Sequence, residues 1–151
     1  MTILNKVIIY ITRPSAAGDE LLVFDHRGMP EAGTQVPAGS VEDGESSEAA
    51  AVRELHEESG LSDIALVGPI DAYDWTNPTT GNVHRRKVFR AHVIGLPDAW
   101  EHTVHGEGDD AGMIFDYRWV PLAGASDLLQ ADQGQSISKI GRAAPLNTTR
   151  T

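Results

Sequence analysis

Three glutamates gather in the second half of one predicted helix, within residues 39–61 (GSVEDGESSEAAAVRELHEESGL). On a helical wheel with about 100° per residue, Glu54, Glu57 and Glu58 fall on one flank. Like charges three or four residues apart repel each other and weaken an isolated helix. The cluster therefore makes chemical sense opposite a cation. A hard divalent ion such as Mg²⁺, which binds a few carboxylates together with substrate phosphates, is the expected partner.

The same helix has a second flank that is apolar. Ala51, Val52 and Leu55 fall together on the wheel, and we expect them to pack against the core. The pattern predicts a helix over residues 47–59, with Gly60 directly after it as the C-terminal cap. This helix would place the acidic flank on a rigid surface.

The spacing of the fixed residues resembles the Nudix box, G-x5-E-x7-R-E-U-x-E-E-x-G-U, in which U is a bulky aliphatic residue. Every specified position is filled, by Gly39, Glu45, Arg53, Glu54, Leu55, Glu57, Glu58, Gly60 and Leu61. The resemblance implies an α/β Nudix fold, in which a mixed β-sheet is sandwiched between α-helices. It also implies that water cleaves the pyrophosphate of a nucleoside diphosphate linked to another group. The alternative without chemistry is a surface helix with a solvated acidic face.

The resemblance assigns roles within the box. The family's metal ligands correspond here to the carbonyl of Gly39 and the carboxylates of Glu54, Glu57 and Glu58. Mg²⁺ is the expected ion, with Mn²⁺ as the alternative. Arg53 lies about 40° from Glu57 on the wheel, so we expect it to fix the orientation of a glutamate. A structural role for Glu45 rests on the resemblance alone.

The general base is left open between a glutamate of the box and a glutamate in a distant loop. Glu107, in the sequence HGEGDD, is the candidate for the loop position. Its neighbours Gly106 and Gly108 would let that loop close over a ligand. A solvated acidic loop without catalytic function is the alternative.

Candidates for substrate binding lie outside the box. Arginine matches phosphate oxygens with two parallel hydrogen bonds, which nominates Arg27, Arg85 and Arg86. Arg85 and Arg86 are neighbours on one predicted strand, so they point to opposite sheet faces and at most one faces a given cleft. Trp75 and Tyr73 share a strand face and would be able to stack on a base, with burial in the core as the alternative for at least one of them.

The substrate class is narrowed by a few residues. The lead-in Pro37-Ala38-Gly39 resembles the ADP-ribose and nucleoside-sugar branch of the family, so ADP-ribose or a nucleotide sugar is favoured. A dinucleoside polyphosphate and a nucleoside triphosphate stay open as alternatives. A non-catalytic nucleotide-binding sensor with the same fold also stays open, although such proteins usually lose box glutamates. The isopentenyl diphosphate isomerase relatives are excluded because they need a cysteine and this chain has none.

Composition limits the partners. The 151 residues carry a net charge of −10, which argues against long nucleic acid, because such binding needs clustered Lys and Arg. A small anionic nucleotide is still compatible, since bound cations reverse the local field. The apolar run near the N-terminus is too short to span a bilayer and no cleavage site follows it, so we expect no membrane association and a cytoplasmic protein. A homodimer is kept open as the assembly.

The elements that would position these residues follow from pattern and turn signals. Strands are predicted over residues 3–12, 20–26, 35–37, 64–75, 83–94 and 113–120. Helices are predicted over residues 47–59 and 122–131, with a further segment at 136–143. A long polar loop is expected over residues 95–112, and loops of that length are more often functional than idle. We expect one domain over residues 1–146 and a frayed tail over 147–151.

Overall fold

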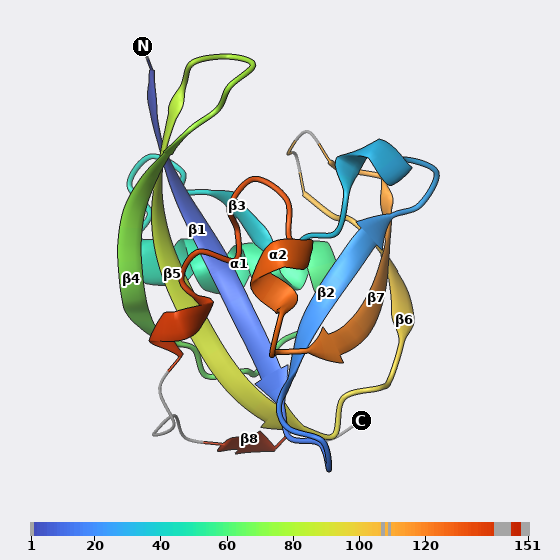
Figure 1. The fold of residues 1–151 in the computed structure, drawn as a ribbon. Coiled ribbons are helices and arrows are strands. Elements are labelled where there is room, and N and C mark those ends of the chain that lie inside the picture. Colours follow the sequence, from blue (N-terminus) through green and yellow to red (C-terminus); the bar gives the residue numbers. More distant parts are fainter. Residues whose placement is uncertain (1, 107, 109, 141–145, 149–151) are drawn as a thin grey trace.

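The computed structural model describes residues 2–106, 108, 110–140 and 146–148. Its strands are β1 (Ile3–Arg13), β2 (Glu20–His26), β3 (Ala38–Ser40), β4 (Val67–Thr76), β5 (Val83–Ile94), β6 (Trp100–Thr103), β7 (Ile114–Pro121) and β8 (Leu146–Thr148). Its helices are α1 (Ser47–Ser59) and α2 (Ala125–Leu128), with 3₁₀ turns η1 (Pro30–Ala32) and η2 (Ile137–Lys139) (Figure 1).

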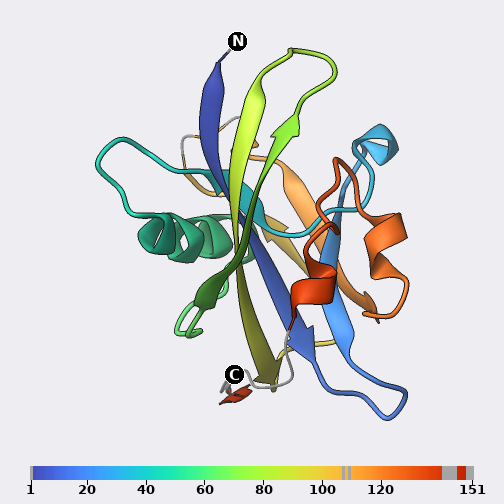
Figure 2. The same cartoon turned by 60° about the vertical axis from the view of Figure 1, so that its left-hand side comes forward.

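The strands form one mixed sheet in the order β4-β5-β1-β2-β7-β6, with β3 added to β1 and β8 added to β5. The long central strands β1 and β5 run parallel to each other, whereas β4 pairs with β5, and β7 with β2, in antiparallel fashion. Turning the molecule by 60° shows α1 on one side of this sheet and α2 with η2 on the other (Figure 2). The expected mixed sheet between helices is therefore confirmed.

Each sheet face carries its own core. Successive side chains of a strand point to opposite faces, and β1 obeys this with Val7 and Ile9 in the core under α1 and Ile8 and Tyr10 in the core under α2. Phe89, Ala91 and Val93 of β5 lie together in the first core, as their alternation predicts. The doubly buried central strands give the site a rigid base.

Helix α1 has the predicted bounds but not the predicted rotation. Ala51 and Leu55 are buried as expected, whereas Val52 is 55% exposed and Glu58 is only 7% exposed. The wheel defines which residues share a flank, but not which flank the sheet will cover. Strand β3 packs against the acidic flank, where Ala38 donates a hydrogen bond to Glu58 and Gly39 lies against Glu54. This flank therefore faces the sheet, and Val52 faces solvent.

Two sequence expectations around β3 and β6 were wrong. The short strand expected at residues 35–37 lies instead at Ala38–Ser40, because that is where the backbone pairs with β1. The loop expected over residues 95–112 contains β6, which pairs with β7 and extends the sheet. Pairing with a neighbouring strand determines where β3 and β6 form, and the sequence of a single segment does not reveal which strand it will pair with.

The C-terminal third is less helical than expected. The helix predicted over residues 122–131 is reduced to α2, which begins after Gly124 in a left-handed conformation (φ 82°) and ends at the extended Leu129. Within residues 136–143, the described part forms only η2. Part of the segment expected as a frayed tail, Asn147 and Thr148, lies in β8, which pairs with the end of β5. None of the helices in the described ranges has the length and apolar content needed to cross a membrane.

Candidate active site

Two adjoining cavities lie where β3 passes the second half of α1. The first, here called the acidic cavity, has a volume of about 400 Å³ and is walled by the glutamates of α1. The second, here called the side cavity, has a volume of about 270 Å³ and is walled by β1, β4 and β5. The residues that line both are Lys6, Ala38, Gly39, Glu58 and Asp110. A ligand with two chemically different halves would therefore find two connected compartments.

Glu58 is the most unusual group of the acidic cavity, because it is a carboxylate that is 7% exposed. Its Oε1 accepts a hydrogen bond of 3.1 Å from the backbone N–H of Ala38 in β3. Burial raises the pKa of Glu58 well above its ordinary value, and the nearby carboxylates of Glu54, Asp110 and Glu57 raise it further. A carboxylate in this setting is stabilised either by a proton or by a cation.

Arg53 ties the acidic residues together. Its guanidinium donates to Glu45 over 2.8 and 2.9 Å, to Glu54 over 2.9 Å and to Glu57 over 3.1 Å. A further bond of 2.8 Å reaches the carbonyl of Ser40 in β3. This geometry fits a residue that fixes the orientation of two glutamates, and it gives Glu45 a contact that the sequence alone did not supply.

The pKa values of Glu45 and Glu54, which both accept hydrogen bonds from Arg53, shift in opposite directions. Hydrogen bonds from Arg53 lower the pKa of Glu45 to about 2. At Glu54, by contrast, burial outweighs the same guanidinium and raises the pKa. Glu45 therefore acts as the fixed negative anchor of Arg53, while Glu54 faces the cavity.

The donor set of the acidic cavity suits a hard divalent cation. It consists of carboxylate oxygens and the backbone of Gly39, which are the ligand types that Mg²⁺ and Mn²⁺ accept. Across the part of the chain that the structure describes, no group of three or more His, Asp or Glu side chains is placed so that these side chains alone could hold a metal ion. Mg²⁺ does not require three protein side chains, because it binds through one or two carboxylates and completes its shell with water and substrate phosphates.

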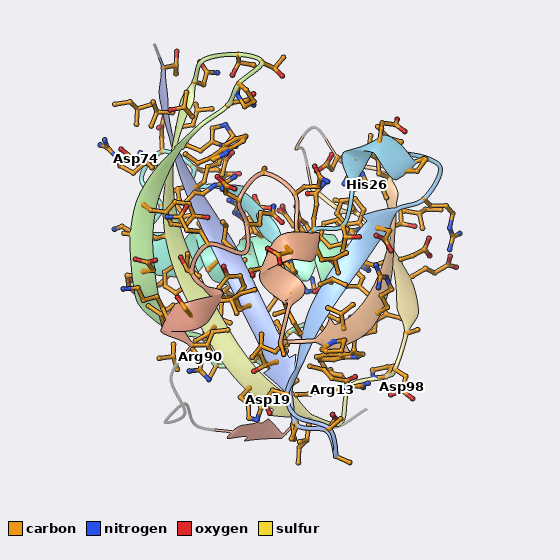
Figure 3. The ribbon with its side chains drawn as sticks, viewed as in Figure 1. Arg13, Asp19, His26, Asp74, Arg90 and Asp98 are labelled. Atoms are coloured by element: carbon orange, nitrogen blue, oxygen red, sulfur yellow. The ribbon has the colours of Figure 1, made fainter. Side chains whose placement is uncertain are left out.

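The arginine and aromatic candidates separate into two groups. Arg86 is 5% exposed and lines the side cavity, where its guanidinium carbon lies 4.5 Å from the ring centre of Trp75. Arg85 points to the other side and pairs with Asp74, which Figure 3 shows on the outer edge of the molecule. Arg27 pairs with Asp116 and Glu101 and lines neither of the two cavities. The structure thus brings Trp75 and Arg86 to the site and leaves Arg27 and Arg85 away from it.

Glu107 lies outside the described residues. Its neighbour Gly106 is described and lies against the acidic cavity, since a Cβ at Gly106 would be 2.8 Å from Cδ of Glu57. The backbone N–H of His105 donates to the carbonyl of Glu57 over 3.0 Å. This loop therefore runs beside the glutamates of α1 up to residue 106.

Sequence reasoning missed several residues that line the cavities. Lys6 interrupts the apolar run of β1 and donates to Ser40 Oγ over 2.7 Å at the junction of the two cavities. A charged residue within an otherwise apolar strand could have indicated a functional position. Gln133 lines the side cavity from the segment between α2 and η2, where no periodic pattern marks it.

The comparison with known proteins agrees with this geometry. The model of the NUDIX domain matches residues 4–140. An RNA pyrophosphohydrolase of Rhodopseudomonas palustris (strain BisA53) is 30% identical over 105 residues, which are 63% of this chain and 59% of that protein. That of Caulobacter vibrioides (strain NA1000 / CB15N) is 29% identical over 115 residues, 69% of this chain and 64% of that protein. The matches thus span less than two thirds of these relatives.

Solved structures show the same fold at low identity. The dihydroneopterin triphosphate pyrophosphohydrolase of E. coli superimposes with a TM-score of 0.66 at 17% identity, covering 93% of this chain and 97% of that one. The Ap4A hydrolase of C. elegans in a binary complex gives 0.63 at 18%, covering 90% and 93%. The NUDIX domain of Shewanella oneidensis NrtR, complexed with ADP ribose, gives 0.63 at 16%, covering 92% and 86%. Because the family model extends from β1 to η2 and the arginine and three glutamates of a complete Nudix box line the acidic cavity, this chain belongs to the Nudix family.

Proposed function

We propose that this protein is a metal-dependent pyrophosphohydrolase that cleaves the pyrophosphate link of a nucleoside diphosphate derivative. The observation that carries the proposal is the shared cavity of Glu54, Glu57 and Glu58, in which Glu58 is almost fully buried. Burying a carboxylate beside two others costs free energy in a helix that is only structural, whereas the same arrangement is useful for holding a cation.

The proposed roles follow from the contacts. Glu54, Glu57, Glu58 and the carbonyl of Gly39 would hold Mg²⁺ or Mn²⁺, which when bound neutralises phosphate charge and polarises the anhydride. Arg53 keeps Glu54 and Glu57 in place by direct hydrogen bonds. Lys6 adds a positive charge where the two cavities join, which suits a phosphate that bridges them.

The general base remains a choice between Glu107 and a glutamate of the box. The approach of Gly106 to the Glu57 carboxylate supports the loop, because it brings the preceding residue of Glu107 to the wall of the acidic cavity. A base must lie within hydrogen-bond reach of the attacking water, directly or through one more water. We therefore propose Glu107 as the first residue to test.

The identity of the nucleoside diphosphate derivative is proposed from the residues that lead into the Nudix box. Pro37-Ala38-Gly39 favours a nucleotide sugar or ADP-ribose, and the side cavity with Trp75 and Arg86 offers a place for the nucleoside. A second candidate is the 5′ end of triphosphorylated RNA, because the similar bacterial proteins are named RNA pyrophosphohydrolases. The net charge of −10 weighs against an RNA chain.

One substrate screen tests the proposal. Purified protein with Mg²⁺ would be incubated with nucleotide sugars, ADP-ribose, dinucleoside polyphosphates, nucleoside triphosphates and triphosphorylated RNA, and the products would be separated by chromatography. Release of a nucleoside monophosphate from a diphosphate derivative supports the proposed function. Turnover of triphosphorylated RNA alone would favour the second candidate. Binding of a nucleotide without any turnover would favour the sensor alternative.

A further inference from the structure

The side cavity has a polar lining that differs from that of the acidic cavity. Besides Trp75 and Arg86, it contains three amide side chains, Gln35, Asn77 and Gln133. An amide has one end that accepts hydrogen bonds and one that donates them. Which end each residue offers to a ligand follows from the bonds that it already makes to the backbone.

Gln133 offers its donor end. The side chain is 6% exposed, and its Oε1 accepts a hydrogen bond of 2.9 Å from the backbone N–H of Val36. A backbone N–H can only donate, so the atom that faces Val36 is the oxygen and the amide orientation is settled. No acceptor for the Gln133 NH₂ group is found within the described ranges, which leaves it directed to the cavity that the residue lines.

Asn77 is oriented in the same way. Its Oδ1 accepts from the backbone N–H groups of Thr79 and Thr80 over 2.9 and 3.4 Å, in the turn between β4 and β5. Its NH₂ group is therefore the end that is left for a ligand. Two amides from distant parts of the chain thus offer N–H donors to one cavity.

Arg86 and Gln35 also line the side cavity. Nη1 of Arg86 donates to Tyr73 Oη and to the carbonyl of Ala131 over 3.2 and 2.6 Å. Among the residues that the structure describes, Nε and Nη2 have no acceptor and stay as donors. Gln35 is turned the other way, because its Nε2 donates to the carbonyl of Ala32 over 3.1 Å and its oxygen remains. Among its amide and guanidinium groups, the side cavity therefore offers three donor groups and one neutral acceptor. Its other charged residues, which lie where it joins the acidic cavity, are Lys6, Glu58 and Asp110.

We propose that the side cavity binds a 6-oxopurine base, so that the preferred substrates carry guanosine rather than adenosine. Of the two favoured substrates, the inference therefore selects a GDP-linked nucleotide sugar over ADP-ribose. The inference rests on the proposed function, because it assigns the nucleoside half of a substrate whose pyrophosphate lies in the acidic cavity.

The edges of the bases explain the choice. Guanine has two acceptors, O6 and N7, side by side on one edge, whereas adenine has N7 beside an amino donor, cytosine has an amino donor and thymine a single carbonyl. The amino group of adenine would meet the N–H groups of Gln133 and Asn77 and lose its hydrogen bond on burial. The N–H groups of guanine have a matching acceptor in the oxygen of Gln35. Trp75 adds an aromatic surface for the base.

Titration with nucleoside monophosphates tests the inference without turnover. GMP, AMP and UMP would be titrated into the protein by calorimetry, with Mg²⁺ and with chelator. We expect GMP to bind at least about 10-fold more tightly than AMP or UMP, in line with the discrimination that one well-placed pair gives. Equal or tighter binding of AMP or UMP overturns the inference.

Two variants locate the effect. In Gln133→Glu and Asn77→Asp one carboxylate oxygen keeps the bond to the backbone, while the NH₂ donor becomes an acceptor. We expect each variant to bind GMP at least about 10-fold more weakly than the wild type does, and AMP less than about 3-fold more weakly. Gln135→Glu is the matched control, because it adds the same charge at an exposed position that lines neither cavity of the site. A GMP preference that survives in both variants, with unchanged melting temperatures, also overturns the inference.

The same protein in the hydrolysis screen separates the two proposals. A GMP preference without hydrolysis of any GDP derivative supports the base assignment and contradicts the proposed function. Hydrolysis of ADP derivatives without a GMP preference supports the proposed function and contradicts the base assignment.

Discussion

Gly39 is a glycine because the carboxylate of Glu54 occupies the place of its side chain. A Cβ at Gly39 would lie 2.0 Å from Cδ of Glu54 and 2.3 Å from its Oε2, far inside van der Waals contact. Gly39 does not have the positive φ that marks many other glycines of this chain. The requirement for glycine is therefore one of space at the acidic cavity and not of backbone conformation.

Gly39→Ala should separate activity from stability. The group that must move is the end of a flexible side chain, so the fold can adapt at small cost. Yet a displacement of about 1 Å in a reacting group can reduce turnover by about 10²-fold. We expect a loss of that order with a melting temperature close to that of the wild type, measured by kinetics and calorimetry on the same sample. Full activity would show that the position of Glu54 is not critical.

The pair of Glu45 and Arg53 predicts a dependence of stability on pH. The pKa of Glu45 is lowered from 4.5 to about 2, so the native state stabilises its charged form. The contribution is present above the unfolded pKa of 4.5 and is lost as the pH falls toward about 2. Denaturant unfolding of wild type and Glu45→Gln should therefore show a gap at pH 7 that narrows below pH 4.5. A gap of constant size would contradict the assignment.

Removal of divalent ions should abolish turnover and leave the fold intact. The two cores consist of apolar and aromatic residues on both sheet faces, and none of the candidate metal ligands belongs to either core. We expect no product in excess EDTA, an unchanged melting temperature or a small shift, and recovery on addition of Mg²⁺. Turnover that persists in EDTA would refute the metal assignment.

Local rules explain why the box helix was predicted with its bounds. Ser46 accepts a hydrogen bond from the N–H of Ala49 and Gly60 adopts the left-handed cap with φ 80°, and both signals are visible within a few residues of sequence. The rotation of α1 is not local. It depends on β3 passing the acidic flank, and so Val52, which was expected to pack against the core, is exposed, whereas Glu58 is buried.

Distance along the chain limits the prediction of the site in the same way. Alternation correctly predicted that Arg85 and Arg86 face opposite sides, but only the assembled sheet shows that Arg86 is the one at the side cavity. Gln133 gains its orientation from the backbone of Val36, 97 positions earlier in the sequence. No short window of sequence contains both Val36 and Gln133, and the residues around Gln133 show no pattern that would predict this contact.

Glu107→Gln tests the choice of general base. If Glu107 takes a proton from the attacking water, the amide should lower kcat by about 10²–10⁴-fold and leave KM nearly unchanged. Steady-state kinetics over a range of Mg²⁺ concentrations would also show whether metal affinity changes. An effect below about threefold would return the role to a glutamate of the box.

Glu58→Gln is the sharpest test of the acidic cavity. Gln keeps the size of the side chain, and its amide oxygen can still accept the hydrogen bond from the N–H of Ala38. The change removes a buried negative charge that lies near Glu54, Glu57 and Asp110. Stability should therefore stay the same or rise, because a charge in a buried acidic setting destabilises the fold in the absence of a cation.

Activity of Glu58→Gln should move in the opposite direction. An amide oxygen is a poorer ligand for a hard cation than a carboxylate, so metal affinity should fall. Turnover should fall by at least about 10²-fold, because preorganised charge matters most where phosphate charge rearranges in the transition state. Glu48→Gln, at an exposed position in the first turn of α1, is the control for the loss of one charge. Near-wild-type turnover of Glu58→Gln, with a melting curve that shows a folded protein, would mean that this flank of α1 is not the catalytic surface.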